Sequence, residues 1–187
     1  MTRLPGTASP RGARAARVAS KNHVVGGKKL ALALKSIEHK ITNGGVLRMG
    51  FLEGSKYPQK TNARFLKAVG SKAAPTVQPE LSIAQVAFWN EYGTTRAPAR
   101  PAFRTTIQKY SPQWGDRLGK AVVAANYDGQ KALGLLGQSM RDDLESEIAQ
   151  WTSPGNAPLT IKIKGFDKPL VDSGDMQRAP DYEVKPK

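Results

Sequence analysis

One serine of the chain stands in a context that would suit nucleophilic catalysis. Ser173 lies between Asp172 and Gly174, and a serine oxygen becomes an effective nucleophile only when a nearby base removes its proton. Histidine is the most frequent base in such sites, but the two histidines of the sequence, His23 and His39, lie far upstream. No residue in the sequence is placed to activate Ser173, and we therefore do not expect a hydrolase.

A cluster of acids offers a second kind of chemistry. Neighbouring carboxylates can hold a metal ion or act as an acid–base pair, but no histidine or further acid is spaced to complete either site, and the chain has no cysteine. The stretch GGKK at residues 26–29 lacks the spacing of a phosphate-binding loop. The sequence thus predicts no catalytic residue, no metal site and no cofactor, and so no enzyme. We interpret the acids as a solvated helix face or as an interface to the basic surface of a neighbour: Asp142, Asp143, Glu145 and Glu147.

Arginines concentrate in the stretch from Ile83 to Arg104, which reads IAQVAFWNEYGTTRAPARPAFR. Apolar residues at helical spacing predict a helix in its first part, and Gly93 ends it because glycine adopts a left-handed conformation without a Cβ penalty. Pro98 and Pro101 favour extended backbone before them, so residues 94–100 are expected to form an ordered loop. Pro101 also suits the first turn of a second helix, in which one face carries Phe103, Ile107 and Tyr110.

The predicted unit is therefore a helix, a rigid elbow (residues 94–100) and a second helix, with arginines displayed around the elbow. A stiff loop loses little conformational entropy when it docks, which suits a contact surface. A plain helix–helix connection with solubilising charges is the alternative. The residues expected at a subunit or partner interface are the four acids above and six residues in or beside the elbow, namely Glu91, Tyr92, Arg96, Arg100, Phe103 and Arg104.

The formal net charge of +14 is unevenly distributed. Residues 1–40 hold nine lysines and arginines against Glu38 alone, a net of +8, which leaves +6 for the rest of the chain. Residues 1–28 are rich in Gly, Ala, Ser and Pro and poor in large apolar residues, so we expect a flexible basic arm. Such an arm suits contact with phosphates, and a solubilising or organelle-targeting tail is the alternative. The expected DNA contacts are Arg3, Arg11, Arg14, Arg17, Lys21, Lys28 and Lys29.

Two amphipathic helices stand out in the rest of the chain. Residues 29–43 place Leu30, Leu34, Ile37 and Ile41 on one helical stripe. Residues 128–151 have the best helical periodicity of the sequence, and Asp128 is a suitable N-cap for them. Residues 111–126 form a third, weaker helical segment, because Gly115 and Gly119 lower its helix propensity.

We predict an α+β fold over residues 29–187. Strands are expected at 46–52 and 181–184, in a small and mostly antiparallel sheet packed by the two amphipathic helices, 29–43 and 128–151. A basic insertion at about 54–80 interrupts this domain as a long loop that holds a short helix or strand. No apolar run approaches the length of a membrane span, and the N-terminus lacks the apolar core of a signal peptide, so no membrane partner is expected.

Two stretches of the sequence resemble a known family. The elbow, NEYGTTRAPARPAFR, is similar to the stretch E-F/Y-G-T … P-A-R-P-F-x-R of the tail-completion (neck, or head–tail joining) proteins of long-tailed bacteriophages. The later stretch PGNAPLTIKIKGFDKPLVDSGDM resembles that family's P-N-x-P-x-T … K-G … K-P-L-x-D-T-G-x-M. The likeness and the order of elements extend from Lys29 to Val184. The departures are Ala102, where the family prefers a bulky aromatic residue, and Ser173, where it has threonine.

The resemblance implies a structural virion protein without an enzymatic step, made and assembled in the host cytoplasm. Such a protein forms a homo-oligomeric ring that completes the tail and joins it to the head. Its partners would be the phage connector and the tail-terminator or tail-tube proteins, with genomic DNA in the lumen bound without sequence specificity. The alternatives are a tail-terminator ring subunit and a cellular protein that binds nucleic acid non-specifically.

Overall fold

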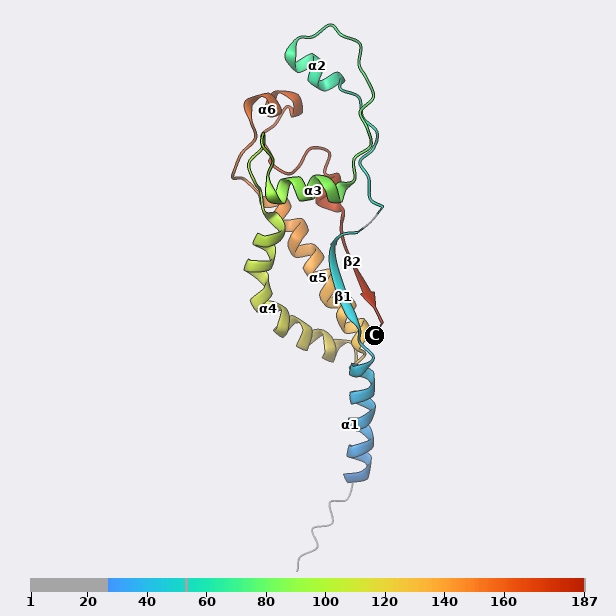
Figure 1. Ribbon diagram of the computed structural model, residues 1–187. Coiled ribbons are helices and arrows are strands. Elements are labelled where there is room, and N and C mark those ends of the chain that lie inside the picture. Colours follow the sequence, from blue (N-terminus) through green and yellow to red (C-terminus); the bar gives the residue numbers. More distant parts are fainter. Residues whose placement is uncertain (1–26, 53, 187) are drawn as a thin grey trace, which may run out of the picture.

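The computed structural model describes residues 27–52 and 54–186, which form an α+β structure (Figure 1). The predicted fold class is therefore confirmed, while residues 1–26, which include most of the expected basic arm, lie outside the described residues. The elements in chain order are α1 (Gly27–Thr42), β1 (Val46–Phe51), α2 (Ala63–Val69), α3 (Ile83–Tyr92), α4 (Ala102–Ala124), α5 (Gly129–Gln150), α6 (Pro158–Lys164), α7 (Asp175–Arg178) and β2 (Pro180–Lys185).

The sheet consists of β1 and β2, which pair antiparallel from Val46 opposite Lys185 to Phe51 opposite Pro180. Both predicted strands are thus confirmed, each within two residues of its expected bounds. The pairing joins an early segment of the domain to its last one (Figure 1). One face of this two-stranded ribbon needs a cover, since an isolated hairpin is marginally stable in water.

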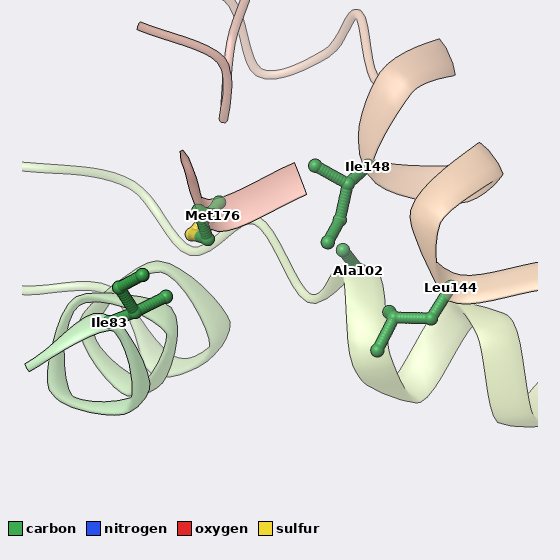
Figure 2. Packing of buried hydrophobic residues seen from close by; sticks show 5 residues of the cluster. All are labelled: Ile83, Ala102, Leu144, Ile148 and Met176. Atoms are coloured by element: carbon green, nitrogen blue, oxygen red, sulfur yellow. The ribbon is translucent and has the colours of Figure 1, made fainter. Parts of the chain in front are cut away.

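Helix α5 supplies that cover and forms the centre of the fold. It begins as predicted at Asp128, whose carboxylate accepts a hydrogen bond from the Lys131 backbone N–H at 3.1 Å. This bond lowers the pKa of Asp128, because the N–H stabilises the charged carboxylate. Leu144 and Ile148 of α5 are fully buried and point toward Ala102 of α4, and Ile83 and Met176 complete the buried cluster (Figure 2).

Helix α4 is a single helix of 23 residues. The sequence had predicted it as two separate segments, 101–110 and 111–126. Pro112 lies inside it, and a proline removes one backbone hydrogen bond and bends a helix. In Figure 1, α4 starts beside α5, bows away from it and returns to it at the other end. The helix continues through the proline because its contact with α5 on either side holds both halves.

Helix α1 does not pack on the sheet, and that prediction is wrong. It has no buried residue and projects from the body beyond the start of β1 (Figure 1). Only its C-terminal end meets α5, where Gly44 lies against Gly129. The junction leaves little room, because a Cβ on Gly129 would stand 2.8 Å from the Gly44 Cα. The amphipathic stripe was correctly placed on a helix, but this helix buries no residue against the described part of the chain.

The basic insertion (residues 54–80) is ordered rather than a structureless loop. Isolated bridges between Lys56 and Ser82 and between Thr61 and Val77 close it like a hairpin. Its tip is α2, which ends at Gly70 in a left-handed conformation and packs against α6 (Figure 1). The insertion therefore presents its lysines from a defined position at the end of the molecule opposite α1.

Candidate assembly interface

The elbow is a hydrogen-bonded turn, as predicted. Gly93 ends α3 with a φ of 77°, and a Cβ there would stand 2.9 Å from the backbone N of Ala99, so only glycine fits. The Thr94 N–H donates to the Ala97 carbonyl at 2.9 Å, and the Thr94 hydroxyl accepts from the backbone N–H groups of Arg96 and Ala97. The turn holds the Arg96 side chain at its exposed tip.

Glu91 and Arg104 form an ion pair with each other within the chain. The Glu91 carboxylate accepts hydrogen bonds from the backbone N–H groups of Phe103 and Arg104, at 3.0 and 3.1 Å, and from the Arg104 guanidinium at 2.8 Å. Glu91 thereby caps the first turn of α4, whose N-cap residue Pro101 has no side-chain hydrogen bond. We predicted both residues at an interface, and the structure corrects this for the Glu91 carboxylate, which is only 12% exposed.

Arg100 is likewise internal, which corrects its predicted place among displayed arginines. Its side chain is 8% exposed and donates from Nε to the Pro154 carbonyl at 2.9 Å and from Nη2 to the Gly155 carbonyl at 2.6 Å. Burial lowers the pKa of Arg100, and the nearby Asp167 carboxylate partly offsets this effect. Arg100 thus fastens the elbow to the turn after α5, 54 residues further along the chain.

The four acids of α5 divide into two pairs with different surroundings. Asp143 binds Arg117 at 2.5 Å and Glu147 binds Lys109 at 3.0 Å, and the side chains of both acids are 13% exposed. The hydrogen bond that the Lys109 ammonium donates to the Glu147 carboxylate also raises the pKa of Lys109. These two acids face α4 of the same chain and are bound there, so neither carboxylate is free to pair with the basic surface of a neighbour. Asp142 pairs with Arg141 of its own helix but keeps a side chain that is 57% exposed, and Glu145 is half-buried.

An apolar groove of about 580 Å³ opens beside the elbow, between β1, α3, α4 and α5. Five predicted interface residues meet at this groove: Glu91, Tyr92, Arg100, Phe103 and Arg104. The Arg104 guanidinium lies 5.1 Å from the centre of the Tyr92 ring, which in turn lies 4.7 Å from the Phe88 ring. The ends of α3 and α4 that flank the elbow thus form one wall of the groove, and Arg100 is the elbow residue that lines it.

Residues predicted to contact DNA fall mostly outside the described part of the chain: Arg3, Arg11, Arg14, Arg17 and Lys21. Lys28 and Lys29 are described, and both are exposed on the first turn of α1. They lie at the end of the molecule opposite the basic insertion (Figure 1).

Comparison of the chain with protein-family models, with curated proteins and with solved structures finds no match. None of the helices within residues 27–52 and 54–186 is long and apolar enough to cross a membrane.

A polar cluster surrounds Ser173, and it contains Lys60 and Arg64 of the basic insertion together with Asp172 and Asp175. The Ser173 hydroxyl donates to the Asp175 carboxylate, and the Lys60 ammonium donates to Ser173 Oγ at 3.2 Å. Lys60 also pairs with the Asp172 carboxylate, with 3.4 Å between the nitrogen and the nearer oxygen. In the described part of the chain, no group of three or more His, Asp or Glu side chains is placed to hold a metal ion.

A tyrosine beside this cluster is held in its protonated form. Burial raises the pKa of Tyr57 to about 12, and the carboxylates of Asp175 and Asp172 add to the effect by disfavouring a second negative charge. Tyr57 is therefore no proton acceptor near neutral pH. The cluster has the character of a structural clasp, in which Asp172 holds two cations of the basic insertion against the C-terminal segment.

Replacing Asp172 by Asn should release the basic insertion. Arg64 and Lys60 bind the Asp172 carboxylate at 3.1 and 3.4 Å, and an asparagine cannot neutralise them. Because both pairs are partly exposed, we expect a loss of global stability below about 1 kcal/mol. Trypsin should nevertheless cut faster after Lys60, Arg64 and Lys67 in timed digests followed by mass spectrometry. Asp142→Asn is the matched control, and equal cleavage of the two variants would contradict the clasp.

Met49 and Phe51 of β1 and Phe88 of α3 contribute the other half of the groove, and none of the three was predicted as a site residue. One signal was present, since Phe88 and Tyr92 are four residues apart and therefore share a helix face away from Ile83, Val86 and Ala87. The position of β1 beside them depends on tertiary packing, which no local pattern encodes.

Proposed function

We propose that the chain is a structural virion protein of the phage neck, which forms a homo-oligomeric ring that completes the tail and joins it to the head connector. The observation that carries the proposal is the contact between the two stretches that resemble the tail-completion family. Arg100 of the first stretch binds the carbonyls of Pro154 and Gly155 in the second. Asn90 of the first also lies 3.9 Å from the sulfur of Met176 in the second. Two distant motifs thus belong to one structural unit.

The exposed surface supports assembly rather than catalysis. Large apolar side chains are more than half exposed on separate elements, among them Leu34 of α1, Phe88 of α3 and Val123 of α4. Apolar surface gathered in patches marks interaction sites in soluble proteins. A ring subunit needs two such surfaces, since each copy meets its two neighbours through different faces.

The distribution of charge fits a subunit with contacts at both ends. The central segment 83–153 holds eight lysines and arginines against seven acids, whereas the basic insertion holds five against Glu80 alone. Positive charge therefore collects on the insertion and on α1, at opposite ends of the molecule (Figure 1). A nearly neutral centre suits contacts between copies, and basic ends suit acidic partner proteins or the phosphates of DNA in the lumen.

The test measures the mass of the purified full-length protein in solution, at low and high salt, with and without duplex DNA and with purified phage tails. A ring-sized oligomer, or a monomer that assembles only on tails, is the expected result. Binding to tails in the absence of connector proteins, with the tube closed at a fixed length, would favour the tail-terminator alternative. A strict monomer that binds DNA with a steep salt dependence and never joins phage particles would favour the cellular nucleic-acid-binding alternative.

A further inference from the structure

Helix α1 carries an apolar seam (Leu30, Leu34, Ile37 and Ile41) that no part of residues 27–52 and 54–186 buries. Leu30, Leu34 and Ile41 are 61%, 56% and 44% exposed, and no residue of the helix is buried. An isolated helix of 16 residues is marginal in water even with a favourable sequence. The seam therefore requires a partner that buries it, and spacings of four, three and four residues are those of a helix that packs along its length.

The charges of α1 leave this seam free to be buried. Lys28, Lys35 and Lys40 lie outside the stripe, on the flanks and the opposite face of the helix. They can remain in water while the seam packs against an apolar surface. Leu32 also lies on this opposite face and is 69% exposed, which makes it a natural control of the same residue type on the same helix.

The apolar groove beside the elbow is the matching surface on the body. Three apolar side chains at the groove are incompletely covered, with Phe88 59%, Tyr92 61% and Ile107 39% exposed. Charged atoms at the groove are largely satisfied internally, because the Glu91 carboxylate binds the start of α4 and Arg104. An apolar helix face could thus enter the groove without leaving a charge unpaired.

A chain cannot place its own α1 in its own groove while the junction between α1 and β1 keeps its structure. The groove borders Met49 and Phe51 near the end of β1, whereas α1 projects from the start of that strand in the opposite direction (Figure 1). Gly44 is packed against Gly129 and Gly45 against the Lys185 carbonyl, which fixes the exit of the helix. An α1 helix that enters the groove must therefore belong to another molecule.

The apolar areas on the two surfaces are similar in size. The exposed parts of Leu30, Leu34 and Ile41 amount to roughly 250 Å², and those of Phe88, Tyr92 and Ile107 to roughly 300 Å². Since a little over half of an interface is apolar, their union corresponds to about 1,000 Å² in total, the lower bound for a specific contact. We propose that the apolar seam of α1 docks in the apolar groove of a neighbouring copy, a contact that repeats around the ring and therefore rests on the proposed function.

Site-specific cross-linking tests this contact directly, because the chain has no cysteine of its own. Two full-length variants with different tags, Leu34→Cys and Ile107→Cys, are co-expressed and treated with a short thiol-to-thiol cross-linker. The expected product is a covalent dimer that carries both tags. Leu32→Cys with Ile107→Cys is the matched control and should give none. In uncross-linked protein, Leu34→Ser should cause loss of the assembled species, whereas Leu32→Ser should not.

Three results would overturn the proposal. The first is absence of the mixed dimer at every protein concentration. The second is a dimer of Leu34→Cys alone, which would place α1 against α1. The third is an internal cross-link in a further variant that carries both Leu34→Cys and Ile107→Cys in one chain, which would place α1 in its own groove. The experiments distinguish a failure of the docking proposal from a failure of the proposed function. If copies join phage tails but positions 34 and 107 do not cross-link, the docking mode is wrong and the neck function stands. If they cross-link but the protein never joins particles, the contact stands and the neck function fails.

Discussion

Replacing Arg100 by Met should lower the free energy of unfolding by about 2 kcal/mol. Methionine keeps much of the aliphatic stem but removes the guanidinium, which donates to the Pro154 and Gly155 carbonyls. Hydrogen bonds that involve a charged group each contribute about 1.5–3 kcal/mol to stability, and the value here lies at the lower end because Gly155 is exposed and water can replace one of the two donors. Part of this cost is offset, because methionine avoids the desolvation of a buried charge. The net effect remains unfavourable, since two carbonyl oxygens lose their partner together.

Arg96→Met is the matched control, because Arg96 stands in the same elbow and its side chain is exposed. Its free energy of unfolding should stay within about 0.5 kcal/mol of the unmodified protein. Urea unfolding followed by tryptophan fluorescence measures both variants, and Trp151 lies next to the turn that Arg100 fastens. Arg100→Lys should fall between them, since lysine keeps the charge but not the two-pronged geometry. Equal midpoints for Arg100→Met and Arg96→Met would show that the contact contributes nothing to stability.

The elements that could be predicted are those whose signals are local. The bounds of α5 followed from one capping residue, Asp128, and from apolar periodicity through Ile148, and both depend on residues within the helix itself. Strand β1 followed from a short apolar run, and β2 was predicted as a strand that closes the edge of the sheet. The elbow followed from Gly93 and Pro98, whose backbone preferences act without any partner.

The location of α1 could not be predicted from the same kind of signal. Its apolar stripe indicates that one face is to be buried. The periodicity does not indicate whether the surface that covers this face belongs to the same chain. In the sequence, Gly44 and Gly45 predict only that the helix ends before them. In the structure, the same two residues form the junction at which α1 points away from the sheet. Packing of Gly44 against Gly129, 85 residues later, decides the direction.

The roles of the charged residues were the least predictable part of the site. Asp142 and Asp143 are adjacent and chemically identical, yet one faces solvent and the other binds Arg117 of α4. Their side chains point in directions about 100° apart around the helix axis, because that is the rotation per residue in an α-helix. Which of the two is paired depends on the position of α4. Glu91 caps a helix that begins eleven residues later, because the turn between them is tight, and capping patterns in sequence look only a few residues ahead.

Replacing Gly137 by Ala should destabilise the protein by about 2 kcal/mol, although alanine is the better helix former. Gly137 lies where α5 crosses the sheet, and a Cβ there would stand 2.7 Å from Tyr182 Cγ and 2.8 Å from Leu47 Cδ1. The first of these atoms is close to the backbone of β2, so the ring cannot simply rotate away. Overpacking costs about 1–3 kcal/mol, and separating the strands from α5 adds to this, which together outweigh the gain of about 1 kcal/mol in helix propensity.

Gly134→Ala, one turn earlier in α5, isolates the helix-propensity effect. No atom lies within 4 Å of the Cβ that this change would add, so the variant should gain between about 0.5 and 1 kcal/mol. The two glycines are thus expected to respond with opposite signs in the same urea titration. Because α5 is the element that both α4 and the sheet pack against, a stabilising Gly137→Ala would mean that the sheet does not lie on this helix face as described. The described groove would then also be wrong, because residues of β1, α4 and α5 line it.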